Sequence, residues 1–213
     1  MKTAIMKTAK KTEEKLDLYR KYSKEYVAPQ TPVLVEVGPA AYLSIKGKGA
    51  PGGAAFTDAV GALYGVAFTV KMTRKFAGKP DYLVSKLEGL WPTLKFGEPA
   101  HDKEQWTWQL MIRTPDFITE KEVKGAIAVL LKRGKTEVVQ QVVLVALEEG
   151  LCVQSLHVGP YDKECLTLEV MRSFAEKKGM KFHGAHHEIY LSDPRRVDPA
   201  KLKTILRHPV KAV

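Results

Sequence analysis

The sequence predicts an α+β protein in which duplicated strand–helix–strand–strand units form an antiparallel sheet with a central ligand cleft. Strand patterns outnumber helix patterns and often follow one another directly, which favours an antiparallel sheet with helices on one face. The chain also repeats one order of elements: residues 42–115 and 153–209 each run strand, helix, a strand with one glutamate, and a closing strand ending in [Ile/Leu]-Arg-x-Pro. Two such units facing each other across a pseudo-twofold axis place a cleft on that axis. Chance similarity of short segments is the alternative.

The two copies match at three places. The matched segments are 42–45 with 153–156, 88–92 with 188–191 (Glu88 with Glu188), and 112–115 with 206–209. A repeat of this size is too large for a solenoid unit. We therefore expect two facing lobes rather than an array of repeats.

The chain before the first repeat predicts a single charged helix. Residues 12–26 place Leu16, Tyr19 and Tyr22 near one another at helical spacing. Pro29 and Pro32 end the pattern, because proline disfavours a helical conformation in the residue before it. One helix at most in residues 1–30 leads us to expect no helix-turn-helix there.

The first copy starts with extended segments 33–37 and 41–45, followed by the glycine-rich loop 46–53. A phosphate-binding loop would end in Gly-Lys-Ser/Thr, which is missing here, so we favour a flexible loop at the rim of the cleft. Segments 81–90 and 106–113 predict two further strands. The segment between the glycine-rich loop and these two strands predicts a helix, because four apolar residues recur at helical spacing: Phe56, Val60, Leu63 and Ala67.

A connecting helix separates the copies. Thr119 and Glu122 form a capping box that opens this helix, and Gly134 ends it. The remaining expected elements are strands 142–147 and 151–158, a helix capped by Asp162 that carries Leu166, Val170 and Phe174, and strands 186–192 and 202–206. We expect one domain over residues 1–213, composed of an N-terminal helical extension (1–30), a first repeat (31–118), the connecting helix (119–140) and a second repeat (141–213).

The composition is that of an ordinary globular protein. The 213 residues are 45% hydrophobic and 27% charged, and no apolar run approaches the ~20 residues of a membrane span. The first residues lack the apolar core of a signal peptide. Cys152 and Cys165 are too few for a disulfide scaffold and lack metal-site spacing. We expect a cytoplasmic protein with no membrane association.

The net charge of +10 raises the question of nucleic acid. Residues 1–30 hold eight Lys/Arg and four Asp/Glu, and the rest of the excess is spread along the chain. No compact basic cluster interleaves with aromatics and no nucleic-acid-binding motif is present. A solvated lysine-rich surface explains the charge better than a specific nucleic-acid partner, although weak, salt-sensitive DNA association stays open.

All three tryptophans fall near the closing strands of the first copy. Trp106 and Trp108 are two residues apart on one strand and therefore share a face, with Trp91 on the preceding strand. Such a cluster either fills a core or forms the wall of a cleft that stacks planar ligands. Indole faces also attract cations by roughly 0.5–2 kcal/mol.

Glu188 is the most specific candidate for chemistry. Alternation places Glu188 and Tyr190 on one face of a strand. A carboxylate in the middle of a sheet is costly unless it is paired or hydrated, and burial can raise its pKa enough to make it a general base or a cation-binding group. A solvated strand face is the alternative. Glu88 is its match in the first copy, so two carboxylates could approach the axis from opposite sides.

The histidines do not form a recognisable metal site. His186 and His187 are adjacent on a strand and point to opposite faces, and their spacing with His183 matches no common zinc motif. We predict neither a metal nor a cofactor. His157, followed by Gly159-Pro160-Tyr161, is a second candidate polar corner, with a plain strand end and turn as the alternative. A Ser-His-Asp triad lacks the Gly-x-Ser-x-Gly elbow.

Four motifs resemble the GyrI-like small-molecule-binding family. They are Glu-Gly-Leu-Trp at 88–91, Trp-x-Trp-x-Leu-Met-Ile at 106–112, Gln-x-Leu-His-x-Gly-Pro-Tyr at 154–161, and His-His-Glu-Ile-Tyr-Leu-Ser-Asp-Pro-Arg-Arg at 186–196. The resemblance covers nearly the whole chain and is nearest to the stand-alone branch, which includes proteins similar to cyclopropanoid cyclohydrolases. The family's fold, a duplicated strand–helix–strand–strand unit, agrees with the repeat.

The resemblance implies an aromatic-lined cleft between the halves with an acidic residue at its base. Glu188 matches the family's cleft glutamate, and Tyr190 and the tryptophans match its walls less closely. We count Glu88, Met111, His157 and Tyr161 as further ligand-binding candidates. The implied ligands are bulky planar or cationic small molecules.

Three functions follow from the resemblance. In the first, Glu188 activates water to open the cyclopropane of a DNA-alkylating compound, with Tyr190 or Tyr161 stabilising the developing phenolate. In the second, the same cleft sequesters cationic or planar drugs without turnover. The third, a role toward gyrase as a protein partner, is implied only by the family name.

Overall fold

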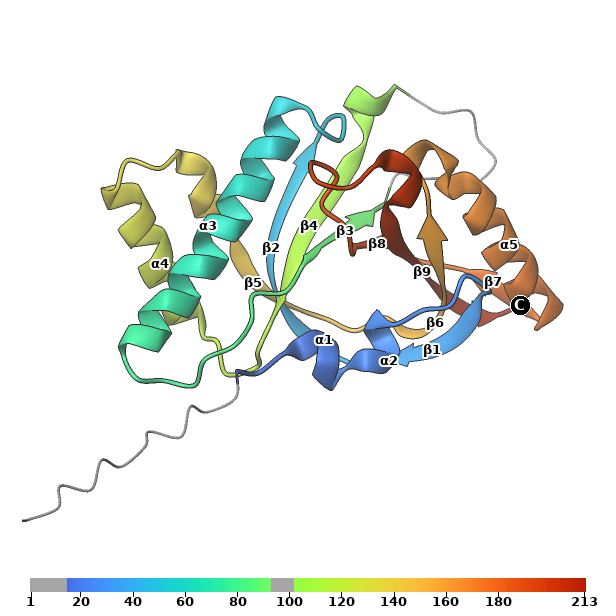
Figure 1. Cartoon of the computed structure of the whole chain (residues 1–213), viewed down its shortest axis with the longest axis horizontal. Coiled ribbons are helices and arrows are strands. Elements are labelled where there is room, and N and C mark those ends of the chain that lie inside the picture. Colours follow the sequence, from blue (N-terminus) through green and yellow to red (C-terminus); the bar gives the residue numbers. More distant parts are fainter. Residues whose placement is uncertain (1–14, 93–101) are drawn as a thin grey trace, which may run out of the picture.

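The computed structural model describes residues 15–92 and 102–213, in which a large antiparallel sheet carries helices on both faces (Figure 1). Short 3₁₀ turns occur at Lys103–Gln105, Glu137–Gln141, Tyr161–Lys163 and Pro199–Lys201. The helices are α1 (Leu18–Lys21), α2 (Ser23–Tyr26), α3 (Ala54–Phe76), α4 (Glu120–Lys132) and α5 (Glu164–Lys177). The strands are β1 (Val33–Val37), β2 (Ala40–Lys48), β3 (Leu87–Trp91), β4 (Thr107–Thr114), β5 (Val143–Leu147), β6 (Gly150–Val158), β7 (Met180–Phe182), β8 (His186–Tyr190) and β9 (Lys203–Ala212).

The sheet confirms the predicted α+β class and its repeated order of elements. Its strands run β1-β6-β9-β8-β3-β4-β2-β5, with β7 paired to β9, and the sheet is not closed. The units β2-α3-β3-β4 and β6-α5-β8-β9 form the two halves, and β7 is an additional strand of the second. Strands β3 and β8 pair antiparallel where the halves meet, so the centre of the sheet is built from one strand of each copy.

The strand that precedes each copy pairs with the other half of the sheet. Strand β1 pairs with β6, and β5 pairs with β2, although only two residues separate β1 from β2 and β5 from β6 along the chain. Gly150 has a positive φ of 65°, which suits the tight turn between β5 and β6 because glycine has no Cβ. The two halves are therefore linked by hydrogen bonds at their outer strands as well as at the centre.

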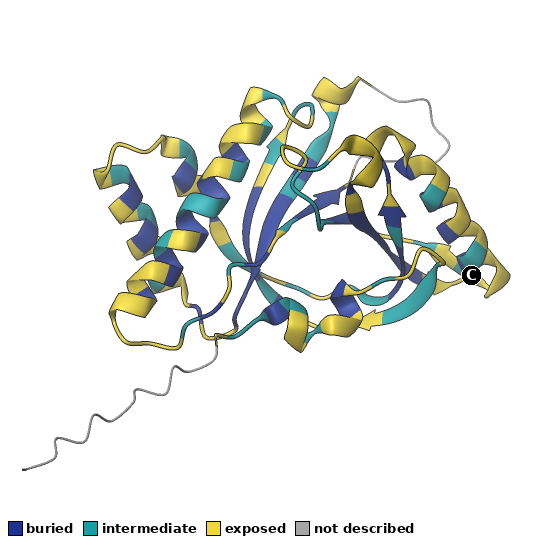
Figure 2. Ribbon diagram, in the orientation of Figure 1, coloured by how far each residue is buried: buried dark blue, intermediate teal, exposed yellow. Residues whose placement is uncertain are grey.

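Helices α3 and α5 cover the same face of the sheet, which we call the helix face. Helix α3 buries Leu63, Val66 and Val70 against β2 and β4, with α4 packed behind it. Helix α5 buries Leu168 and Met171 against β6 and β9. Figure 2 shows buried residues along the inner sides of these helices and on the central strands. Each fully buried apolar side chain contributes roughly 1.5–3 kcal/mol.

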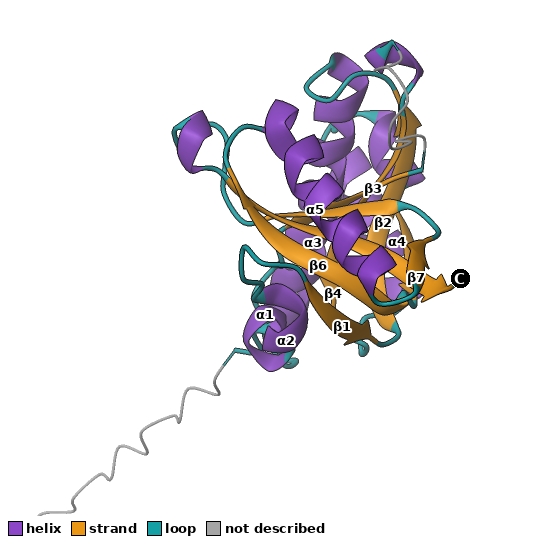
Figure 3. Ribbon diagram, turned by 90° about the vertical axis from the view of Figure 1, so that its right-hand side faces the viewer, coloured by secondary structure: helices purple, strands orange, loops and turns teal. Residues whose placement is uncertain are grey.

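The N-terminal helices α1 and α2 cover the opposite face, and the strand layer passes between them and α5 (Figure 3). Tyr26 packs on Ile189 and Ile205 of β8 and β9. The arginines of the duplicated [Ile/Leu]-Arg-x-Pro motif hold this segment in place: Arg113 donates to the Glu25 carboxylate at 2.5 Å, and Arg207 donates to the Glu25 carbonyl oxygen. The repeated motif thus serves to anchor α2.

Several local expectations hold and others fail. The Thr119–Glu122 capping box is confirmed. The single helix expected at 12–26 is instead two short helices, with Asp17 capping α1, and residues 12–14 lie outside the described part. Asp162 lies in a 3₁₀ turn and does not cap α5, whose N-cap is Lys163. Segment 81–86 is not a strand, apart from one bridge between Tyr82 and Leu16.

Candidate functional site

The central strands present a polar and aromatic strip to the helix face. In the register of β3 and β8, Gly89 lies opposite Glu188 and Trp91 opposite His186. Partners across an antiparallel pair point to the same side, so these four residues share a face with Tyr190. Phe56 of α3 stacks on Trp91 with ring centroids 6.1 Å apart, which identifies this side as the helix face.

Glu188 is buried and well oriented. Its exposed fraction is 7%. The Tyr190 hydroxyl donates to Glu188 Oε2 at 2.7 Å, and His186 Nε2 lies 3.4 Å from Glu188 Oε1. Burial and the neighbouring Glu188 charge raise the pKa of Tyr190 well above its usual value, so Tyr190 keeps the proton that it donates. The carboxylate is therefore held in one orientation within the sheet.

Gly89 makes room for this arrangement. The Tyr190 hydroxyl also accepts a hydrogen bond from Trp91 Nε1 at 3.2 Å. A Cβ added at Gly89 would lie 3.1 Å from the Tyr190 hydroxyl and 3.2 Å from Trp91 Nε1, tighter than ordinary van der Waals contact. A side chain here would push apart the Trp91–Tyr190 pair that orients Glu188.

A second buried carboxyl group near Glu188, that of Glu164, was not predicted from the sequence. Glu164 is the first residue of α5, is 6% exposed, and lies within range of the charge of Glu188. Burial, followed by the Glu188 charge, raises the pKa of Glu164 far above its usual range. Two carboxyl groups close together in a buried site cannot both ionise readily. We call Glu164 and Glu188 the carboxyl pair.

The sequence does contain a pattern that points to Glu164, but the buried face of this helix was predicted wrongly. Leu166 and Val170, which were expected on the helix after Asp162, are 60% and 56% exposed. The buried stripe consists of Glu164, Leu168, Met171 and Ala175. Spacings of four, three and four residues define one helix face, and a glutamate at the first position of such a stripe marks a buried carboxyl group.

The three tryptophans lie close together, as the sequence indicated, and Trp91 contacts Tyr190. Trp91 and Trp106 meet edge to face at 6.0 Å, and Phe56 contacts Trp108 at 5.5 Å. Trp91 and Trp108 are each only 3% exposed and fill the core, whereas Trp106 is partly exposed. Trp108 lies directly over Gly47, where an added Cβ would come within 2.1 Å of the ring. Of the three, Trp106 has the surface to contact a ligand.

Tyr161 lies on the α5 side of the same region. Its ring meets Tyr190 edge to face at 6.0 Å, and it is 39% exposed. Burial and the charges of Glu164 and Glu188 raise the pKa of Tyr161 to about 12. Tyr161 is therefore a neutral phenol with an accessible surface.

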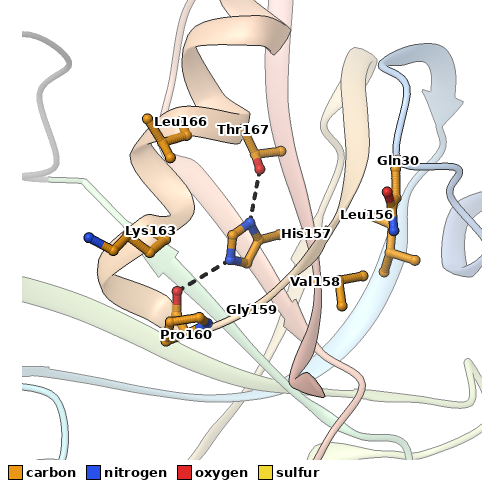
Figure 4. A pocket seen from close by; sticks show the side chains of 9 residues that line it. All are labelled: Gln30, Leu156, His157, Val158, Gly159, Pro160, Lys163, Leu166 and Thr167. Carbon is orange, nitrogen blue, oxygen red and sulfur yellow. Dashed lines mark hydrogen bonds between the residues drawn. The ribbon is translucent and has the colours of Figure 1, made fainter. Parts of the chain in front are cut away.

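His157 lies two strands away from Tyr190, with Thr204 of β9 between them. Its Nδ1 is 2.9 Å from Thr167 Oγ1 and its Nε2 is 3.3 Å from the Pro160 carbonyl oxygen (Figure 4). Both ring nitrogens are thus occupied, which is the geometry of a strand end fastened to a turn. His157 lines a cavity of about 360 Å³ that does not include Glu188.

Glu88 and Met111 do not join this site, because both point to the opposite face. Glu88 is paired with Ile189 rather than Glu188, and Met111 with Glu88. Matching Glu88 to Glu188 in the repeat was one residue out of register, and a one-residue shift moves a side chain to the other face. Met111 is fully buried with Leu90 and Tyr42 in an apolar cluster.

Glu88 belongs instead to a buried ionic network under α2. It accepts from the Tyr26 hydroxyl at 3.1 Å and lies 3.1 Å from His187 Nε2. His187 Nδ1 is 2.9 Å from Glu149, which Arg207 also contacts at 3.0 Å. Burial alone would lower the pKa of His187, but Glu149 and Glu88 outweigh it and raise the pKa to about 9. This network braces β3 and β8 from behind the site.

Comparison with known proteins assigns the family. The GyrI-like small-molecule-binding domain matches residues 95–211. An uncharacterized conserved protein from Listeria innocua is 38% identical, with a TM-score of 0.86 over 92% of this chain and 100% of that chain. A hydrolase from the same organism is 36% identical, with a TM-score of 0.84 over the same shares. The EcmrR C-terminal domain shares the fold, at 14% identity and a TM-score of 0.54 over 85% of this chain and 98% of that chain. No curated protein matches significantly.

The fold and the site define a small-molecule-binding domain built from a duplicated unit. The chain belongs to the GyrI-like small-molecule-binding domain family. Among the described residues, no helix is long and apolar enough to cross a membrane.

Proposed function

We propose that the protein hydrolyses the strained cyclopropane of planar DNA-alkylating compounds in the cytoplasm and thereby detoxifies them. Glu188 acts as the general base. It takes a proton from water, whose oxygen attacks a cyclopropane CH₂ carbon. The ring C–C bond breaks, and its electron pair moves into the conjugated carbonyl, which becomes a phenolate and is then protonated from solvent.

The observation that carries the proposal is the buried Glu188 carboxylate on the helix face, oriented by Tyr190 and adjacent to Trp91. A positioned general base contributes typically 10²–10⁴-fold, and a strained ring needs little further activation. The partly exposed Trp106 supplies a flat wall on which a planar substrate stacks. The relatives from Listeria innocua named as hydrolases, at 36% identity, support the reaction class.

The two tyrosines take different roles in this proposal. Tyr190 already donates to Glu188 and accepts from Trp91, so it positions the base and does not reach for the substrate oxygen. Tyr161 is a neutral phenol with a partly exposed ring beside Tyr190. It is the residue that donates a hydrogen bond to the developing phenolate.

A second candidate function is sequestration of cationic or planar drugs without turnover. It is favoured by one feature: among the described ion pairs, neither Glu164 nor Glu188 has a lysine or arginine partner. A buried negative charge beside indole rings attracts a cationic ligand, since both groups stabilise positive charge.

Mass spectrometry of a cyclopropane-bearing alkylator incubated with catalytic amounts of protein distinguishes the two functions. Hydrolysis yields many equivalents of the water adduct. Loss of compound limited to one equivalent, without a water adduct, contradicts hydrolysis and supports sequestration. Glu188→Gln should abolish the adduct and keep planar ligands bound; Glu169→Gln, at an exposed position of α5, is the matched control and should behave as wild type.

A further inference from the structure

Helices α3 and α5 occupy equivalent positions in the two copies of the repeat. The residues that they bury toward the sheet have the same spacing of four, three and four: Ala59, Leu63, Val66 and Val70 in α3, and Glu164, Leu168, Met171 and Ala175 in α5. When the helices are aligned on these residues, Gly65 of α3 corresponds to Val170 of α5, since each directly precedes the third buried residue. The surroundings of α3 can therefore be compared with those of α5 residue by residue.

In the first copy, a second helix covers the outer side of α3. Helix α4 packs along α3, and a Cβ added at Gly65 would lie 3.7 Å from a methyl group of Leu130. Val123 and Ala126 of α4 are buried with Leu130 in the same apolar cluster as α3. An amphipathic helix thus shields this side of the repeat unit from solvent.

In the second copy, the equivalent side of α5 is open. Helix α4 lies outside α3 at one end of the molecule, whereas α5 is itself the outermost of the described helices at the other end (Figure 1). Val170, the counterpart of Gly65, is 56% exposed, and Leu166, one turn earlier, is 60% exposed. Phe174, one turn later, is partly exposed. We call Leu166, Val170 and Phe174 the outer stripe, because residues four apart lie on one side of a helix.

A cavity of about 360 Å³ adjoins the outer stripe at Leu166. It lies between the start of α5 and the end of β6, where Val158 and Lys163 also line it (Figure 4). Val158 is itself 38% exposed. The outer stripe and this cavity form one exposed apolar surface with a hollow at its end, and such surfaces mark sites of protein interaction.

The charges beside the outer stripe select the kind of partner. Lys163 and Lys177 lie two helical turns before and after Val170, so they flank the stripe on its own side of the helix, and both are exposed. If two copies of the chain paired through α5 about a twofold axis, each of these lysines would face a lysine of the other copy, whether the helices ran parallel or antiparallel. Like charges opposite each other disfavour that pairing. A partner helix with acidic residues near both ends would instead form ion pairs with Lys163 and Lys177.

We propose that the outer stripe binds an amphipathic helix of a partner protein, in the place that α4 takes in the first copy. The partner helix presents apolar residues at positions i, i+4 and i+7 and acidic residues near its two ends. Recognition of a helix in an apolar groove uses this spacing. The interaction involves none of the residues assigned to hydrolysis, so it is independent of the proposed function.

Binding of a labelled peptide, followed by fluorescence anisotropy, tests the proposal. The peptide has the sequence of residues 119–134 with the exposed lysines replaced by Lys121→Glu, Lys124→Glu and Lys132→Glu, and a cross-link on its polar side keeps it helical. It should bind the wild-type protein with a Kd below about 1 mM. The same peptide with its lysines retained should bind more weakly, because Lys163 and Lys177 repel it.

Two variants of the protein locate the binding site. Val170→Glu should weaken binding of the acidic peptide at least about tenfold, whereas Val143→Glu, at a valine of β5 that is 51% exposed, is the matched control and should bind as wild type. Failure of the acidic peptide to bind wild type, or equal binding by the two variants, overturns the proposal. Sedimentation that shows a dimer of the wild type, lost in Val170→Glu, would mean that a second copy covers the outer stripe, which also overturns it.

Discussion

The buried His187 should make the stability of the protein fall steeply in mild alkali. His187 is fully buried between Glu149 and Glu88 and bridges the network under α2. Its pKa is raised from 6.5 to about 9. Because the folded-state pKa exceeds the unfolded one, the stabilisation is complete below about pH 6.5 and is lost as the pH rises through about 9. At about 1.4 kcal/mol per pKa unit, the loss is roughly 3 kcal/mol.

Urea unfolding of wild type and His187→Gln measures this effect. The glutamine can hydrogen-bond to both carboxylates but carries no charge, so the gap in unfolding free energy should narrow by roughly 3 kcal/mol between about pH 6 and about pH 10. Groups that titrate in both proteins cancel in this comparison. His183→Gln, at an exposed histidine, is the matched control and should track wild type. A gap that stays constant across this range would show that His187 is uncharged in the fold and refute the reasoning.

Three further predictions concern the anchor of α2, the strand next to Glu188 and the aromatic wall. Arg113→Met should lower the free energy of unfolding by about 3–5 kcal/mol because it leaves the Glu25 carboxylate buried without its partner. In thermal denaturation, Arg113→Met/Glu25→Gln should be more stable than Arg113→Met alone. If the destabilising effects of the two substitutions simply add, the two residues do not form a direct pair. Gly89→Ala should lower the rate of hydrolysis at least about tenfold, because the added Cβ displaces Tyr190, which orients Glu188. Gly61→Ala is the control and should leave the rate unchanged, because a Cβ there meets open space. Equal rates for the two variants would argue against tight packing around Gly89. Trp106→Ala should weaken calorimetric binding of a planar cation by about 0.5–2 kcal/mol, and unchanged affinity would remove Trp106 from the site.

Local patterns were sufficient to predict the order of elements and several details. The Thr119–Glu122 capping box requires only residues that are neighbours in the chain. Trp106 and Trp108 belong to one apolar cluster, although Trp106 precedes β4 and does not lie on the strand as expected. Strand alternation also places Glu188 and Tyr190 on one face, where the Tyr190 hydroxyl donates a hydrogen bond to Glu188.

Features that depend on register or on contacts between distant segments could not be predicted in this way. The repeat placed Glu88 opposite Glu188, but strand pairing places Gly89 there; short sequence matches do not fix register to one residue, and one residue decides the face. The exchange of β1 and β5 between the halves leaves no local pattern. The second carboxyl group was missed because the exposed Leu166 and Val170 suggested the wrong face of α5.

The role of Glu188 is tested most directly by single-turnover hydrolysis in isotopically labelled water, with excess protein and a cyclopropane-bearing planar compound. Wild type should transfer one labelled oxygen to the product, and Glu188→Gln should bind the compound yet react about 10²–10⁴-fold more slowly. If the variant incorporates label at the wild-type rate, Glu188 is not the base, and the carboxyl pair is not the catalytic centre.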